Sequence, residues 1–258
     1  MVRLMRIGIL CGHHMPDLMK DSDRIKVHTP YGDIALQTST LDDHEVFYIQ
    51  RHGEEANLPP HRVNHLGNIH ALAVSHVSCV FSVGTVGSMK NSIQPGELVI
   101  PHDFIDATKA RPTTFFDDQR VHVDMTEPFC PSLRELVIHS SKKLKDITVH
   151  DHGVYLVTEG PRLETAAEIQ LYSRVADIVG MTLAPEVILA REKGMCFVSL
   201  CLVCNMAAGL QKKVPADEIV SVYKKKEPLI SKILQLTIRS LNEKQPCSCP
   251  GDISKATL

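Results

Sequence analysis

Short apolar runs alternate along this chain with segments whose apolar residues recur at three- and four-residue intervals. A short apolar run bounded by glycine or polar residues is typical of a buried strand, whereas the wider spacing is typical of an amphipathic helix. Strands are predicted at residues 7–11, 45–50, 77–83, 97–100, 151–158 and 195–204, with a hairpin at 25–38. Helices are predicted at residues 61–76, 132–144, 165–172 and 216–241. This alternation predicts an α/β domain with a largely buried sheet flanked by helices.

Prolines and glycines mark the element boundaries. Pro161 ends one predicted strand, Pro185 lies in the first turn of a further helix, and Gly194 lies just past that helix. No linker and no internal repeat divides the chain. We therefore predict one domain over residues 1–242 and a C-terminal tail over residues 243–258 that carries a Cys-x-Cys sequence.

Composition narrows the class of protein. The chain has 258 residues, of which 43% are hydrophobic and 22% charged, as in an ordinary globular domain. Its formal net charge of −2 gives no reason to expect a nucleic acid or an anionic membrane as partner. No apolar run approaches the roughly 18 residues of a membrane span, and the N-terminal run is too short for a secretory signal. We expect a cytoplasmic protein.

Eight cysteines would indicate a disulfide scaffold in a short secreted chain, but a chain of this length does not need one. Cys201 and Cys204 have the spacing of zinc ligands, yet residues three apart on a strand point to opposite faces. Cys247 and Cys249 are interpreted as a pair of thiols, with a local disulfide or redox clip as the alternative. No metal site is predicted from these spacings.

Polar or small residues follow several predicted strands. On sheets of this kind ligands collect at the carboxyl ends of the strands. These ends carry residues 12–14, 51–53, 84–88, 180–182 and Asn205. Arginine, histidine, threonine and the amides at a helix start supply the charge and donors that an oxyanion such as phosphate needs. The amide of Asn205 offers both a donor and an acceptor, which suits the edge of a heterocycle. The pattern indicates a small-molecule site.

Other catalytic patterns are absent from the sequence. The chain has no G-x-S-x-G elbow, no phosphate-binding G-x-x-x-x-G-K-[ST] loop, no H-E-x-x-H helix and no EF-hand loop. A complete G-x-G-x-x-G after the first strand is also missing.

Over about residues 5–240 the chain resembles the trimeric purine nucleoside phosphorylase and methylthioadenosine/methylthioinosine phosphorylase family. The stretches that carry the likeness are RHGEEANLPPHRVNHLGNIHAL, GSMKNSIQPGELVIPHDFIDATKARPTTFFDD, MTEPFCP, EGPRLETAAEI and GMTLAPEVILARE. The resemblance implies a single α/β domain around a mixed, partly barrel-like sheet. It also implies phosphorolysis of a purine nucleoside without metal or cofactor, with inorganic phosphate as co-substrate, and assembly as a homotrimer or a multiple of it.

The resemblance also assigns site residues. It implies that Arg51 and His52 bind phosphate, that the backbone of Thr85 contacts it, and that Thr182 is shared between phosphate and ribose. His13 stands where the family has a small hydroxyl residue, and we predict that it contacts phosphate; the alternative is that His13 and His14 both face solvent.

For the base and sugar, the residues implied are Val86, Gly87, Leu163, Glu164, Met181, Asn205 and Ala207. His122 falls near the position that reaches into the 5′ subsite of a neighbouring subunit. Asn205 would act in catalysis by stabilising the negative charge that builds on the leaving purine.

The sequence NMAAG at residues 205–209 resembles methylthioinosine phosphorylases, whereas aminopurine members carry Asp-x-Asp there. An amide can donate to a 6-keto oxygen, so we predict a preference for a 6-oxopurine, as in 5′-methylthioinosine. The products would be free purine and 5-methylthioribose 1-phosphate. The alternative substrate is 5′-methylthioadenosine.

The chain departs from the family pattern at three places: His13 and His14 in the first loop, Ala56 in place of a histidine, and Leu163 in place of a stacking aromatic. They leave open a different class of protein, a non-catalytic purine-binding protein with a degraded phosphate loop. A hydrolase that uses water in place of phosphate is a third alternative.

Overall fold

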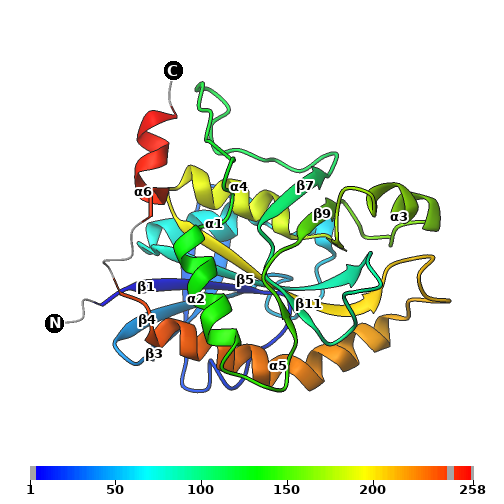
Figure 1. The fold of residues 1–258 in the computed structure, drawn as a ribbon. Helices are drawn as coiled ribbons and strands as arrows, with labels where there is room; N and C mark the ends of the chain where they lie inside the picture. Colours follow the sequence, from blue (N-terminus) through cyan, green and yellow to red (C-terminus); the bar gives the residue numbers. More distant parts are fainter. Residues whose placement is uncertain (1–3, 243–246, 257–258) are drawn as a thin grey trace.

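Three parallel strands run side by side through the middle of the molecule: β1 (Arg6–Cys11), β5 (Cys79–Ser88) and β11 (Cys196–Met206). Figure 1 shows them in the computed structural model, which describes residues 4–242 and 247–256. β5 is the shared strand of the sheet. Its first half pairs with β1 and its last two residues pair with β10 (Ile178–Gly180), while β11 follows its whole other edge.

The remaining strands extend the sheet from this centre. Beyond β1 lie β4 (His44–Gln50), β3 (Gly32–Leu41) and β2 (Asp23–Thr29), of which β2 and β3 form the predicted hairpin. Beyond β10 lie β9 (Val154–Thr158) and β7 (Asp103–Ala107), and β6 (Leu98–Val99) and β8 (Val149–His150) continue from β11. Parallel and antiparallel pairs occur together, so the predicted mixed sheet is confirmed.

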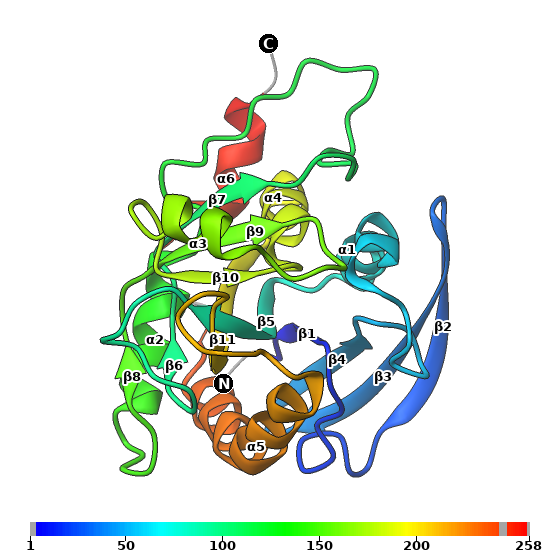
Figure 2. The ribbon, with the colours of Figure 1, turned by 90° about the vertical axis from the view of Figure 1, so that its right-hand side faces the viewer.

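Helices cover both faces of this sheet (Figures 1 and 2). α1 (His65–Val74) and α4 (Leu183–Glu192) lie on one face, and α2 (Pro131–Ser141) and α5 (Ala216–Arg239) lie on the other. Shorter helices are η1 (Pro60–Arg62), α3 (Ala166–Tyr172), α6 (Cys249–Asp252) and η2 (Ile253–Lys255). Cys201 packs in the core beside α1 and α4, whereas Cys204 packs beside α2 and α5. The prediction that these two cysteines point to opposite faces is therefore confirmed.

Side-chain caps fix where two predicted helices begin. The helix predicted at residues 61–76 starts at His65, because the side chain of Asn64 accepts a hydrogen bond from the Gly67 amide at 2.9 Å. Thr165 is likewise a cap rather than the first helical residue, and it forms a reciprocal capping box with Glu168.

Two central strands are longer than predicted. The apolar pattern stops near Gly84 in β5 and at Asn205 in β11, but main-chain pairing between the strands continues to Ser88 and Met206. Residues 84–88, predicted as a strand exit, therefore belong to the strand. Glycine permits this close pairing, since a Cβ on Gly87 would lie 3.0 Å from Nδ2 of Asn205. β7 was not predicted, because its mixed residues show no alternation.

None of the helices in the described part of the chain is both long and apolar enough to cross a membrane.

Candidate active site

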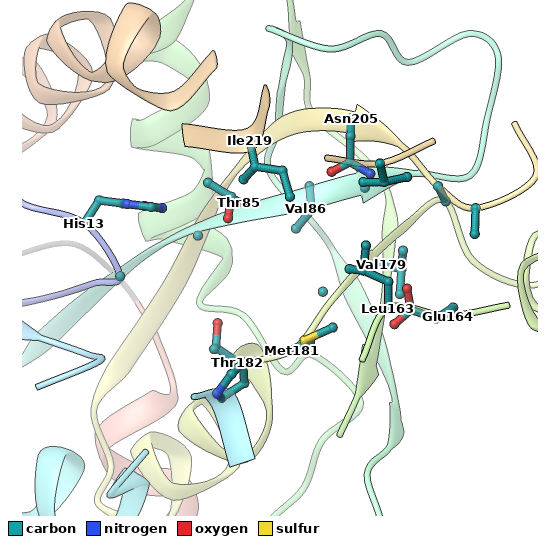
Figure 3. A pocket seen from close by; sticks show the side chains of 18 of the residues that line it. His13, Thr85, Val86, Leu163, Glu164, Val179, Met181, Thr182, Asn205 and Ile219 are labelled. Carbon is teal, nitrogen blue, oxygen red and sulfur yellow. The ribbon is translucent and has the colours of Figure 1, made fainter. Parts of the chain in front are cut away.

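A pocket opens at the end of the sheet where β1, β4, β10 and β11 finish, and the last part of β5 forms its floor (Figure 3). Every residue predicted to bind phosphate, base or ribose lines it. The lining residues are Gly12, His13, Arg51, His52, Pro60, Gly84, Thr85, Val86, Gly87, Leu163, Glu164, Val179, Gly180, Met181, Thr182, Asn205, Ala207, Ala208, Val214 and Ile219. The residues that the sequence placed at separate strand ends therefore line a single pocket.

His122 is the predicted residue that does not line this pocket. It is exposed on the long connection between β7 and α2, and its backbone N–H donates to the carbonyl of Ala256 at 2.8 Å. Its contribution to a neighbouring subunit stays a prediction.

Arg51 is the buried cation of the site, with a side chain only 1% exposed. Its Nε and Nη2 donate to the two carboxylate oxygens of Glu186 at 2.6 and 3.0 Å. Nη2 also donates to Ser82 Oγ at 2.7 Å, and Nη1 donates to the carbonyl of Val83 at 2.8 Å. A guanidinium has five N–H donors, so one N–H on Nη1 has no acceptor among the described residues. Nη1 lies toward Gly12 at the pocket edge.

Glu186 holds this arginine in place. Burial by itself would raise the pKa of the Glu186 carboxyl, but the charge of Arg51, together with His65, outweighs it and lowers the pKa to about 2. Nδ1 of His65 lies 3.5 Å from Oε1 of Glu186, and burial lowers the pKa of His65. The carboxylate is therefore ionised and the imidazole neutral near neutral pH.

His52 and His13 add neutral hydrogen-bonding groups rather than charge. Burial, and then the positive charge of Arg51, lower the pKa of His52. Its Nδ1 donates to the carbonyl of Leu58 at 2.7 Å, so the neutral ring carries a lone pair on Nε2, close to Gly12. Burial, and then His52 and Arg51, lower the pKa of His13 to about 4. The ring of His13 stacks on Tyr223 with centroids 4.1 Å apart, and His14 is exposed.

Thr182 lies opposite the floor strand at the start of α4. Its hydroxyl makes no capping bond to the helix. A Cβ on Gly84 would lie 3.9 Å from Thr182 Oγ1, which shows how closely this hydroxyl faces β5. A hydroxyl that is not used as a helix cap keeps its O–H free to donate to an anion.

Asn205, Leu163 and Glu164 line the other end of the pocket (Figure 3). An amide and a carboxylate beside an apolar side chain are suited to a heterocycle. The pairing of β11 with β5 shifts register between Val203 and Asn205, and such a bulge re-aims the side chains beyond it. Nδ2 of Asn205 donates one hydrogen bond to the carbonyl of Met206 at 2.9 Å, which fixes the orientation of the amide. Glu164 accepts from the hydroxyl of Thr158 at 2.6 Å.

Sequence reasoning missed Arg111, whose side chain is 3% exposed. It donates to the carbonyls of Met181, Ala184 and Glu159 at 2.5, 2.8 and 2.7 Å. Arg111 thereby fixes the backbone on both sides of Thr182. A lone arginine in an irregular segment gives no sequence signal for this. Glu186 was also missed, although a carboxylate within the apolar stretch LAPEVILA indicates a buried partner.

A buried, oriented arginine joined by one pocket to an amide-bearing apolar end is the arrangement of an enzyme that brings an oxyanion to a heterocyclic substrate. The family profile described as Phosphorylase superfamily matches residues 6–239. The chain therefore belongs to the phosphorylase superfamily.

Relatives at substantial identity agree with this membership. The chain is 40% identical over 253 residues to an S-methyl-5′-thioadenosine phosphorylase of Pyrococcus furiosus, covering 97% of this chain and 98% of the relative. It is 44% identical over 231 residues to a probable S-methyl-5′-thioinosine phosphorylase of Methanosarcina acetivorans, covering 89% and 88%. The crystal structure of a methylthioadenosine phosphorylase from an antarctic soil metagenomic library matches with a TM-score of 0.91 at 30% identity, covering 99% and 93%.

Replacing Glu186 by Gln should destabilise the fold, because the buried charge of Arg51 would lose its counter-ion. We expect a loss of about 3–5 kcal/mol in the free energy of unfolding, measured by denaturant titration at pH 7. The contribution of Glu186 is present above the usual carboxyl pKa of 4.5 and is lost as pH falls toward 2, so the difference from wild type should narrow with acidification.

Glu192→Gln is the matched control for Glu186→Gln. Glu192 is also buried on α4, but it accepts from the Thr114 hydroxyl and the Phe115 amide, and no lysine, arginine or histidine of the described residues forms a salt bridge with it. Equal losses in the two variants would contradict a special role for the Arg51–Glu186 pair.

His13→Ser tests whether this histidine contacts phosphate. If the neutral ring donates to phosphate, the phosphate concentration for half-maximal rate should rise about tenfold, as for one lost hydrogen bond. His14→Ser is the control, because His14 is exposed and lies outside the pocket. A sharp gain in activity for His13→Ser would show instead that the ring obstructs the site.

Proposed function

We propose that the protein cleaves 5′-methylthio purine nucleosides with phosphate, preferring a 6-oxopurine, to give free purine and 5-methylthioribose 1-phosphate. The observation that carries this proposal is the layout of the pocket. One end holds Arg51, His52, His13 and Thr182, and the other holds Asn205 among Val86, Leu163 and Ala207. A ribose between the two ends would present its anomeric carbon to phosphate and its base to Asn205.

The phosphate end supplies directed donors. The remaining Nη1 N–H of Arg51, the hydroxyl of Thr182 and the backbone at Thr85 would hold the anion in line with the bond that breaks. Cleavage of an N-glycosidic bond develops positive charge on the sugar. The bound phosphate stabilises that charge and then forms the new bond to the anomeric carbon.

At the base end, Asn205 supports the preference for a 6-oxopurine. One amide N–H is used by the Met206 carbonyl, and the other N–H and the amide oxygen are left for the ligand. A carboxylate would accept from a 6-amino group but would face a 6-keto oxygen with like polarity. Glu164, held by Thr158, would accept from a ring N–H of an oxopurine.

Two apolar side chains support the proposed 5′-methylthio substituent of the nucleoside. Val214 and Ile219 line the pocket from the segment that leads into α5 and from α5 itself. These side chains would pack against an apolar 5′-methylthio group, whereas they offer no hydrogen-bond partner to a 5′-hydroxyl.

We also infer that the protein acts as a homotrimer in which His122 of each subunit approaches the 5′ end of a neighbouring site. His122 is exposed and lies outside the pocket of its own subunit, which suits a role across an interface. No cofactor is required in this proposal beyond phosphate as co-substrate.

The proposed function is tested by release of free base from inosine, adenosine, methylthioinosine and methylthioadenosine, with and without phosphate. We expect phosphate-dependent cleavage, with the highest kcat/KM for methylthioinosine. A clear preference for methylthioadenosine would contradict the base assignment. Base release without phosphate would indicate a hydrolase, and purine binding without turnover would indicate a binding protein.

Asn205→Asp tests the base end separately. We expect the rate with methylthioinosine to fall about 10²–10³-fold, because a donor to the leaving base is replaced by an acceptor. The rate with methylthioadenosine should fall much less. Asn91→Asp is the control, since Asn91 is exposed and outside the pocket. Equal losses with both nucleosides would contradict recognition of the 6-position by Asn205.

A further inference from the structure

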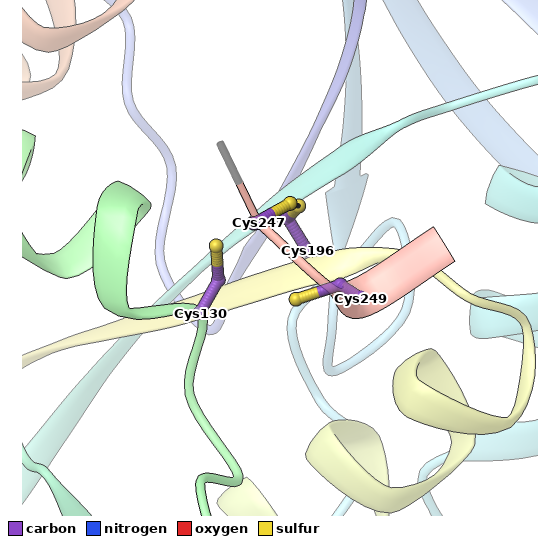
Figure 4. A group of neighbouring side chains, drawn as sticks. All are labelled: Cys130, Cys196, Cys247 and Cys249. Atoms are coloured by element: carbon purple, nitrogen blue, oxygen red, sulfur yellow. Dashed lines mark hydrogen bonds between the residues drawn. The ribbon is translucent and has the colours of Figure 1, made fainter. Parts of the chain in front are cut away.

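Four cysteines from distant parts of the chain converge on one another (Figure 4). They lie at the amino end of β11, opposite to the end that lines the pocket. Cys130 precedes α2, Cys196 begins β11, and Cys247 and Cys249 come from the C-terminal segment. Their four Sγ atoms all lie within 4.8 Å of one another, and those of Cys196 and Cys247 are 3.3 Å apart. We propose that these four cysteines bind one Zn²⁺ ion that fastens the C-terminal segment to the α/β core.

The sulfur spacing fits a single tetrahedral ion. With Zn–S bonds of about 2.3 Å, the sulfurs of a tetrahedral site stand about 3.8 Å apart. The observed upper limit of 4.8 Å leaves only small side-chain movements to reach this geometry. Four cysteine ligands and no open position are typical of structural zinc sites rather than catalytic ones.

Backbone contacts independent of the sulfurs hold the ligands near one another. The amide of Cys130 donates to the carbonyl of Phe197 at 2.9 Å, and the amide of Cys196 donates to the carbonyl of Ser78 at 3.0 Å. The C-terminal segment packs over Gly194, where a Cβ would lie 3.5 Å from the Cα of Pro250. Cys249 is buried by this packing.

Arg191 places a buried N–H donor beside the cysteine cluster, in addition to its ion pair with Asp252. Its side chain is 5% exposed and contacts the side chains of Cys249 and Asp252. Its Nε is buried and has no hydrogen-bond partner in the described part of the chain. Zn²⁺ with four thiolates carries a net charge of −2, so a guanidinium beside the site offsets charge and can donate to a sulfur.

The zinc site is separate from the active site. Cys196 is the first residue of β11 and Asn205 the second to last, so about 30 Å of strand separates them at about 3.3 Å per residue. The site fixes residues 247–256, of which Ala256 accepts the backbone hydrogen bond from His122. This departs from the sequence-based expectation of no metal, because the spacing of the cysteines along the chain does not reveal their convergence.

Metal analysis of the full-length protein, purified with a mild reductant and without chelator, tests the proposal. We expect about one zinc per chain, and at least a tenfold lower content in Cys249→Ser. Cys79→Ser is the matched control: Cys79 is buried and pairs in register with Cys196, but it lies outside the four-sulfur cluster. Equal zinc loss in both variants, or bound iron in place of zinc, would overturn the assignment.

Two measurements on the wild-type chain keep the test independent of how the variants fold. Replacement of the metal by Co²⁺ should give the intense thiolate charge-transfer and tetrahedral d–d absorption bands of a four-sulfur site. The intact mass of the acid-denatured, unreduced protein should correspond to eight free thiols. A mass lower by two hydrogens for each S–S bond, together with an absence of zinc, would show that the four cysteines form disulfide bonds instead.

Discussion

The ion pair of Arg51 and Glu186 organises the pocket end of the fold. Each charge loses its water on burial, which costs several kcal/mol per ion and is offset by the partners that its lone pairs or N–H groups find. Here the carboxylate receives two N–H groups of the guanidinium, and the backbone carbonyls of Leu10 and Val83 receive others. The pair therefore joins the end of β4 to α4, across the end of β1 and the middle of β5. Neither residue can move without leaving a buried charge unpaired.

The same pair limits how the pocket attracts an anion. Glu186 offsets the charge of Arg51, and burial keeps His13 and His52 neutral, so the site offers little net positive charge. Under the proposed function, binding of phosphate would depend on directed donors rather than on charge alone. Direction matters for the chemistry, because a nucleophile has to be held in line with the bond that breaks. Arg111, which fixes the backbone around Thr182, contributes to this direction without touching the pocket.

The sequence predicted those parts of the fold and site that local patterns encode. Apolar runs located most strands, and the rule that ligands collect at strand ends brought Arg51, Thr182 and Asn205 together before any coordinates. It could not predict Glu186 as the partner of Arg51, since a pairing across 135 residues leaves no local trace. Nor could it predict that β5 continues to Ser88, because backbone pairing with β11 outlasts the apolar pattern. The convergence of Cys130 and Cys196 with the C-terminal cysteines is hidden for the same reason.

β11 runs from the four-cysteine cluster at its amino end to the pocket at its carboxyl end. Its first residue lies in the cysteine cluster and its last residues lie in the pocket, while β5 pairs with it along its whole length. A loss of order at the cysteine end would reach Asn205 along β11 by shifting the register of this central pair. Nine of the eleven side chains of the strand are buried, so such a shift would exchange core-facing residues between the two faces of the sheet. A fastened C-terminal segment at the amino end of β11 would therefore stabilise the fold at a distance from the pocket at its carboxyl end.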